Sequence, residues 1–144
     1  MSVNQASTVS ELLQTDWSLA NPLAVTNISW PTTRLEAIGI TQGGTIQVAV
    51  YNNSPAKTVD ALANRCYLIT EKLVIDIIVR NGGSDHTSLA AAEGSLEALI
   101  AEVYRIIHLQ DPNYVVSGEP IHADAPEITR CMINVDAVYF HISS

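Results

Sequence analysis

Three segments alternate their apolar and polar positions with the period of two that β-strands show. They are Thr45–Tyr51, Lys72–Arg80 and Arg130–Ile142. β-Branched residues, which favour the pleated backbone of a sheet, dominate the second segment. We predict a strand at each segment and a hairpin between the first two, with Cys66–Ile69 as a candidate start of the second strand. The last strand turns apolar on its second face from Val138 onward, which indicates burial on both sides or cover by another subunit.

A helical pattern follows the second strand. From Leu89 to Gln110 apolar residues recur every three or four positions and form one stripe, with Glu93, Glu97, Glu102 and Arg105 opposite it. The turn Asn81-Gly82-Gly83 precedes this helix, and Ser84 or Asp85 is a candidate N-cap. The dipeptide Asp111-Pro112 ends it, because proline disfavours helical geometry in the residue before it. The pattern predicts a long helix that packs its stripe on the sheet.

The N-terminal part predicts less regular structure. Thr8-Val9-Ser10-Glu11 has the form of a capping box, which indicates a short first helix that ends by Asn21-Pro22. The segment Leu23–Ile40 is either an edge strand or an ordered loop, because Pro31 interrupts any central strand.

Three connections remain. Asn52–Pro55 is a predicted turn, and Lys57–Asn64 is either a short helical turn or an excursion over the sheet. After the long helix, Asn113–Ser117 is a predicted brief strand and Gly118–Pro126 a predicted acidic loop bounded by prolines.

Together these elements predict the α+β class, with a mainly antiparallel β-sheet packed against one long amphipathic helix and a short N-terminal helix. We expect a single domain over residues 1–144, since a chain of 144 residues is long enough to bury one core. No internal repeat or linker interrupts the pattern.

Composition narrows the classes of partner. Apolar residues make up 47% of the chain and charged residues only 15%, so part of the surface is expected to face another subunit. The formal charge of −8 disfavours direct binding to nucleic acid or to anionic lipid heads. The N-terminus lacks the pattern of a signal peptide, and no run approaches the roughly 20 apolar residues of a membrane span. We therefore expect a soluble protein made inside a cell.

Candidate chemistry is sparse. Cys66 and Cys131 lie in apolar runs without a paired-cysteine motif and are interpreted as free core thiols. The histidines His86, His108 and His122, like His141, lack metal-ligand spacing. Potential metal ligands gather locally in one place only, and we interpret that group as solvated loop charge; it consists of His122, Asp124, Glu119 and Glu127.

The sequence signals for other kinds of functional site are weaker still. The residues after Asn81 lack the glycine and lysine spacing of a phosphate-binding loop, and no nucleophile elbow is present. Asp76 and Asp136 lie within apolar strands, where an isolated charge is costly to bury. We expect them to pair with cations, for which Lys72, Arg80 and Arg130 are the candidates, or to point to an outer face or subunit boundary. No catalytic, cofactor-binding or metal-binding residue is assigned, and an enzyme is not expected.

The order of elements carries one resemblance. The predicted order is a short helix, a hairpin region, the strand ending Val-Ile-Asp-Ile-Ile-Val-Arg80, the long helix ending Glu102-Val-Tyr-Arg-Ile-Ile107 and a closing strand from Arg130. This order resembles that of the tail-terminator and head–tail joining proteins of tailed phages and archaeal tailed viruses. The resemblance covers Thr45 to Ile142, and the stretch from Asn21 to Gln42 does not map onto it. It implies a virion structural protein of the neck or tail that has no catalytic residues and assembles in the host cytoplasm.

The same resemblance implies the partners. The subunits are expected to form a homo-oligomeric ring of about six copies that docks on the tail tube or the head–tail connector. The closing strand and the strand Thr45–Tyr51 are expected to contribute to subunit contacts, and the loops around Asn81 and Glu119 to meet the next ring. Two alternatives remain: a small enzyme or ligand-binding protein with a site between subunits, using His122 and Asp124, and an adaptor whose terminal strand pairs with one partner.

Overall fold

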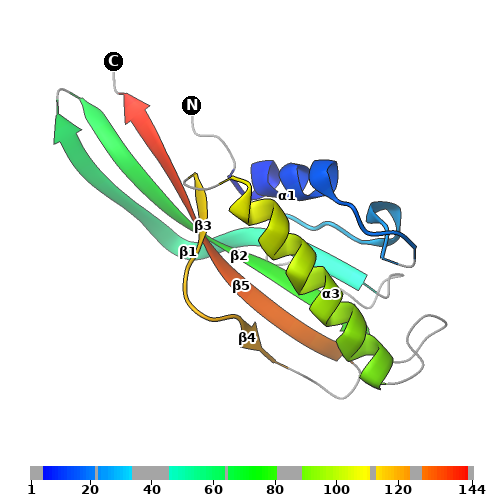
Figure 1. Ribbon diagram of the computed structural model, residues 1–144. Helices are drawn as coiled ribbons and strands as arrows, with labels where there is room; N and C mark the ends of the chain where they lie inside the picture. The colour runs from blue at the N-terminus through cyan, green and yellow to red at the C-terminus, as the bar shows by residue number, and fades with distance from the viewer. Residues whose placement is uncertain are drawn as a thin grey trace.

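The fold is α+β, as the sequence predicts. The structure, a computed structural model, describes residues 5–21, 23–33, 46–63, 65–80, 89–110, 113–123 and 128–142. In chain order the described elements are α1 (Gln5–Asp16), the 3₁₀ turn η1 (Val25–Asn27), β1 (Ile46–Ala63), β2 (Cys66–Arg80), α3 (Leu89–His108), β3 (Tyr114–Val116), β4 (Ile121–His122) and β5 (Ile128–Ile142). Figure 1 shows two helices lying against one long, twisted sheet.

The described strands form a five-stranded sheet in the order β1-β2-β5-β3, with β4 paired to β5 beside β3. All pairings between these strands are antiparallel, which confirms the mainly antiparallel sheet. The pairing between β2 and β5 runs the full length of β2, so that its residues Cys66 and Arg80 pair with Ile142 and Ile128 of β5. β2 therefore lies between β1 and β5, with β1 beside it from Cys66 to Val79.

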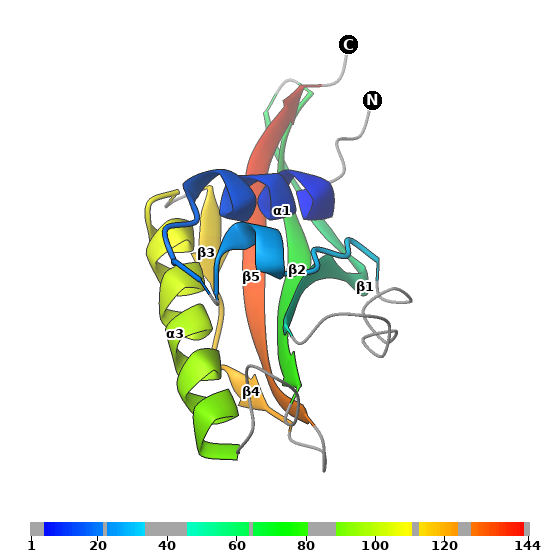
Figure 2. The same ribbon diagram turned by 90° about the vertical axis from the view of Figure 1, so that its right-hand side faces the viewer.

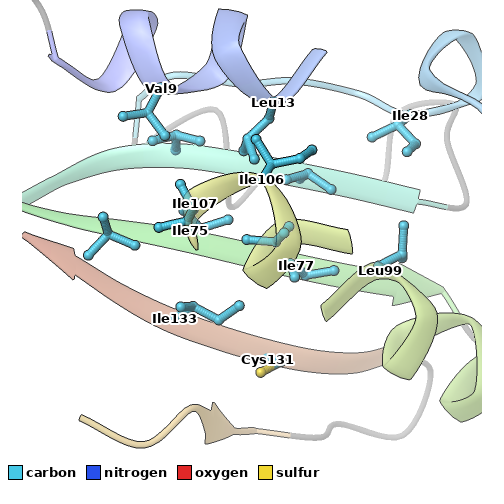
Figure 3. Close-up of a cluster of buried hydrophobic side chains, with 14 of the residues drawn as sticks. Val9, Leu13, Ile28, Ile75, Ile77, Leu99, Ile106, Ile107, Cys131 and Ile133 are labelled. Carbon is cyan, nitrogen blue, oxygen red and sulfur yellow. The ribbon is translucent and has the colours of Figure 1, made fainter. Parts of the chain in front are cut away.

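The helices α1 and α3 cover the same face of the sheet (Figure 2). Side chains at alternate positions of β1, β2 and β5 point into this layer because successive residues of a strand face opposite sides. Figure 3 shows part of the resulting core between the helices and the strands. Its largest fully buried side chains are Leu13, Ile46, Leu73, Ile75, Ile77, Leu99, Ile106, Ile107, Ile133, Val9 and Val48.

The strand β1 is much longer than predicted. It continues through Asn52–Pro55, where we expected a turn, and through most of Lys57–Asn64, where we expected a helical turn or an excursion. The register against β2 shifts between Asn52 and Lys57, so this stretch forms an irregularity within a strand. Pro55 is tolerated because β1 is an edge strand, where a missing N–H costs little. The chain reverses instead at Arg65, whose φ of 67° lies in the left-handed region.

Smaller differences lie at other connections. Helix α1 begins at Gln5, so Thr8 lies within its first turns instead of capping it. The predicted acidic loop contains the short strand β4, which pairs with Met132 and Cys131 of β5. The predicted strand at Asn113–Ser117 is confirmed as β3. The glycine turn and N-cap candidates at 81–85 and the helix stop at 111–112 lie outside the described residues.

Glu102 of α3 is buried, although the helical pattern places it opposite the apolar stripe. Its carboxylate accepts hydrogen bonds from the backbone N–H and from Oγ of Ser18, the latter at 2.8 Å. Arg105 donates to both of its oxygens, with Nε at 2.9 Å. Arg105 also donates to the carbonyl of Asp16 at the end of α1. The pair thus joins α3 to the segment that follows α1, which explains why a carboxylate is buried there.

This linkage predicts a pH dependence of stability. The hydrogen bond from Arg105, helped by those from Ser18, lowers the pKa of Glu102 from its ordinary value of 4.5 to about 2. A carboxyl with a depressed pKa in the folded state stabilises the fold fully above its unfolded pKa and loses that contribution as the pH falls. Glu102→Gln is expected to lower the free energy of unfolding at pH 7 by about 1.5 kcal/mol and to flatten its decline between pH 5 and pH 2.

Urea unfolding at a series of pH values measures this effect. Glu97→Gln is the matched control, because Glu97 lies exposed on the same helix. If both variants kept the acid-side slope of the unaltered protein, the contribution assigned to Glu102 would be wrong.

Candidate functional site

The strands β1, β2 and β5 extend beyond both helices as a three-stranded arm (Figure 1). We define the arm as residues 58–63, 66–70 and 138–142, which pair with one another in rows from Thr58–Thr70–Val138 outward. No described residue of the arm belongs to the buried core clusters. The arm is therefore held by backbone pairing without a hydrophobic layer on either face within the described part of the chain.

The arm exposes large apolar side chains. Val59 is 55%, Leu62 53% and Phe140 68% exposed to solvent. Val59 points to the helix-bearing side of the sheet, since it pairs with Ile69, and Phe140 points to the opposite side, since it pairs with Leu68. Exposed apolar residues that gather on one projecting element are typical of a protein interaction surface.

The outer edges of the sheet are covered along the body of the molecule. Beside β1, the N–H of Val48 donates to the carbonyl of Ser29 and that of Val50 to the carbonyl of Pro31, each at 2.9 Å. We expected the strand Thr45–Tyr51 to contribute to subunit contacts. Between Ile46 and Val50 its outer backbone edge is already paired with residues of the same chain. Beside β5, the strands β3 and β4 cover residues 131–132 and 135–137.

Along the arm both outer edges are open among the described residues. The last bond on the β5 side joins the N–H of Val138 to the carbonyl of Asn113, at 2.9 Å. Backbone groups alternate in direction along a strand, so those of Phe140 and Ile142 point to the same open side. Unpaired strand edges are templates for pairing with another chain. The described part of the chain thus covers the sheet edges over the body and leaves them open on the arm.

A pocket of about 340 Å³ lies at the base of the arm, where β3 begins and the open edge of β5 starts. The hydroxyl of Tyr114 donates to Oε1 of Gln5 at 2.9 Å, which ties β3 to the start of α1 at this point. Burial, followed by the charge of Glu71, raises the pKa of Tyr114. The pocket is lined by Gln5, Asn113, Tyr114, Ala137, Val138, Tyr139 and Phe140.

A buried carboxylate also lies where the arm begins. Glu71 is 5% exposed and accepts a hydrogen bond from Nδ2 of Asn52 at 2.8 Å. Asn52 is the last residue of β1 before its register shifts, so this contact joins β1 to β2 at the irregularity. The second oxygen of Glu71 has no hydrogen-bond partner among the described residues.

Three polar side chains form a cluster on the face of the sheet opposite the helices. Nε of Arg130 on β5 donates to Asp76 on β2 at 2.9 Å, and its second nitrogen donates to the other carboxylate oxygen. The hydroxyl of Tyr51 on β1 also donates to Asp76, at 2.9 Å. Burial and the charge of Asp76 raise the pKa of Tyr51. Asp76 thus pairs with Arg130, one of the three cations considered for it, and Asp136 pairs with Lys72, another of them, at 3.5 Å.

Among the described residues, those weighed earlier as metal ligands are not brought together. His108 and His122 are exposed, as is Glu119, and the described residues contain no group of three potential ligands. His86, Asp124 and Glu127 lie outside the described part of the chain.

The two cysteines differ in their surroundings. Cys131 is a buried core thiol, and burial followed by the charge of Asp76 raises its pKa to about 11. Cys66 is also free but only half-buried, at the hairpin end of the arm, so the prediction of a core thiol is wrong there. It lies outside the core because the arm has no helical layer over it.

No protein-family model matches the chain, and a search of curated proteins gives no similar sequence. Within the described residues, none of the helices is both long and apolar enough for a membrane span.

Proposed function

We propose that this protein is a virion structural protein of the neck or tail of a tailed virus, either a tail terminator or a head–tail joining subunit. It acts by forming a ring and docking on the tail tube or the connector, and it performs no catalysis. The observation that supports this proposal most is the projecting arm, which exposes Val59, Leu62 and Phe140 and leaves both of its edges open in the described chain.

In this proposal the body and the arm have separate tasks. Helix α3 takes the part of the long amphipathic helix that such subunits pack against their sheet, and together with α1 it covers one face of the body. The arm supplies two different edges, which suit a cyclic assembly because its interfaces join one surface to a different surface of the neighbour. Assembly takes place in the host cytoplasm, and the finished ring remains in the virion.

The mass of the purified protein in solution tests the proposal. Light scattering coupled to size exclusion, over a concentration series, is expected to give one species of about six subunits. Phe140→Asp is expected to shift the population toward the monomer by at least about tenfold, since a charge cannot be buried unpaired in an apolar contact.

The control for this measurement is Leu109→Asp. Leu109 is 63% exposed and lies just after α3, outside the arm strands, so its substitution is expected to leave the ring intact. A protein that stays monomeric at every concentration would contradict the ring. A ring that tolerates Phe140→Asp would contradict only the part assigned to this residue.

The pocket at the base of the arm favours a second candidate, a ligand-binding protein or enzyme with a site between subunits. Its volume of about 340 Å³ is in the range of small-molecule sites, which are usually lined by apolar groups with a few polar ones. Binding of a small molecule that Tyr114→Phe weakens while the assembly persists would favour this function. The exposed arm also suits a third candidate function. In that case the protein is an adaptor that remains a monomer and pairs its arm with one strand of a partner.

A further inference from the structure

Both outer edges of the arm are open among the described residues. We infer that copies of this chain join head to tail, with the open edge of β5 (residues 139–142) pairing with the outer edge of β1 (residues 58–63) of the next copy. The inference rests on the proposed function, since it specifies how the ring closes. It goes beyond that function by assigning the two strands, their relative direction and the side chains that meet.

The distribution of covered and open edges supports this assignment. Along the body the chain uses its own residues Ser29–Pro31 beside β1 and its own strands β3 and β4 beside β5. On the arm both edges are open over similar lengths in the described chain, and Val59 and Phe140 are exposed beside them. A long, flat apolar edge invites aggregation unless it is paired.

The occupant we assign is a second copy, because one copy carries both halves of the contact. A single strand from another protein would cover one edge and leave the other open. Both β1 and β5 run antiparallel to β2, so they point in the same direction along the arm. A copy rotated about an axis along the strands therefore brings β1 beside β5 in parallel. Such pairing extends the sheet from subunit to subunit by main-chain hydrogen bonds.

Rotation about that axis keeps each residue at its own level along the arm. Val59, Ile69 and Tyr139 form one row across the three strands and point to the helix-bearing side of the sheet. The neighbour's Val59 thus meets Tyr139, which lines the pocket at the base of the arm. The apolar side chain that is most exposed on this side of β1 is covered at the pocket of the adjacent copy.

Cysteine cross-linking tests the contact. In a Cys66→Ser background, the double variant Val59→Cys and Tyr139→Cys is oxidised and examined on denaturing gels. Within one chain the two positions are separated by two strand spacings of about 4.8 Å each, or about 10 Å in all. This exceeds the roughly 7 Å that a disulfide spans between Cα atoms. Only contacts between copies can therefore join them, and a ladder of covalent oligomers ending at the ring is expected.

The single variants are the matched controls. Val59→Cys alone and Tyr139→Cys alone are expected to give no cross-link, because a head-to-tail contact never joins equal positions. Strong dimers of Val59→Cys alone would reveal a two-fold contact between β1 edges and would overturn the inference.

Ring formation by the uncross-linked proteins separates the two proposals. Val59→Asp is expected to reduce the ring at least tenfold, whereas Leu109→Asp leaves it unchanged. A ring that survives Val59→Asp, or that forms without the disulfide ladder, overturns this inference and leaves the proposed function standing. If the unaltered protein forms no ring at all, the proposed function and this inference both fail.

Discussion

Arg130→Met is expected to lower the free energy of unfolding by about 3–5 kcal/mol, because it leaves the carboxylate of Asp76 buried without its cation. Asp76 is fully buried, and both of its oxygens accept hydrogen bonds from Arg130. The hydroxyl of Tyr51 can satisfy one oxygen but cannot neutralise the charge. The cluster joins β1, β2 and β5, so its loss weakens all three strands that continue into the arm.

Urea or thermal unfolding measures this loss, with Lys72→Met as the control. Lys72 pairs with Asp136 on the same two strands, but its side chain is half exposed. Such a pair contributes about 0–1 kcal/mol. The double variant Asp76→Leu and Arg130→Met is expected to recover much of the loss, because no unpaired charge remains. Equal effects of Arg130→Met and Lys72→Met would show that the charge of Asp76 is satisfied in another way.

The cluster also illustrates what the sequence can predict. The cost of burying Asp76 in an apolar strand indicated either a cationic partner, for which Arg130 was one of three candidates, or a position on an outer face or subunit boundary. The choice among them depends on register: Asp76 pairs with Met132, so Arg130 lies two residues along β5 on the same face. Register between strands far apart in sequence is not encoded in any one segment. The sequence therefore indicated which cations could pair with Asp76, but it could not select Arg130 among them.

The body of the fold followed from local pattern. The alternation in Lys72–Arg80 and Arg130–Ile142 predicted the buried faces of β2 and β5, because residues two apart face the same layer. The same reasoning failed at Glu102. Helical spacing placed it opposite the stripe, but the segment after α1 packs there and supplies Ser18 as a donor. Burial from a segment distant in sequence overrides the pattern of a single helix.

The arm was missed because its local signals are those of a turn. Asparagine and proline at Asn52–Pro55 favour chain reversal, and only the partner strand turns this stretch into an irregularity within β1. The run from Cys66 to Ile69 did indicate a strand. A strand there needs a partner, and Thr58–Ala61 supplies one in the register that continues the hairpin. Extending the predicted hairpin beyond its first turn candidate would have revealed the arm.

Division into body and arm gives the molecule two sources of stability. The body buries its apolar residues between the helices and the sheet, whereas the arm leaves Val59 and Phe140 exposed, and in the proposed ring these side chains contact other chains. A ring that binds only the folded subunit adds stability that depends on protein concentration. Substitutions in the core and on the arm should therefore differ in how their effects respond to dilution.

Leu99→Ala is expected to lower the free energy of unfolding by about 2–5 kcal/mol, because it opens a cavity in a well-packed core. Leu99 is fully buried, and it points from α3 into the core between the helices and the sheet (Figure 3). Leu109→Ala, on an exposed leucine just beyond the same helix, is expected to change it by less than about 0.5 kcal/mol.

Unfolding of both variants at several protein concentrations gives the full comparison. The unfolding midpoint of Leu99→Ala should lie well below that of the unaltered protein at every concentration. Both midpoints should rise with concentration by the same increment, since the arm contacts remain. Phe140→Asp should behave in the opposite way, with a nearly unchanged midpoint at high dilution and little rise on concentration. A concentration dependence that vanished in Leu99→Ala instead would place the subunit contact on the body and contradict the role assigned to the arm.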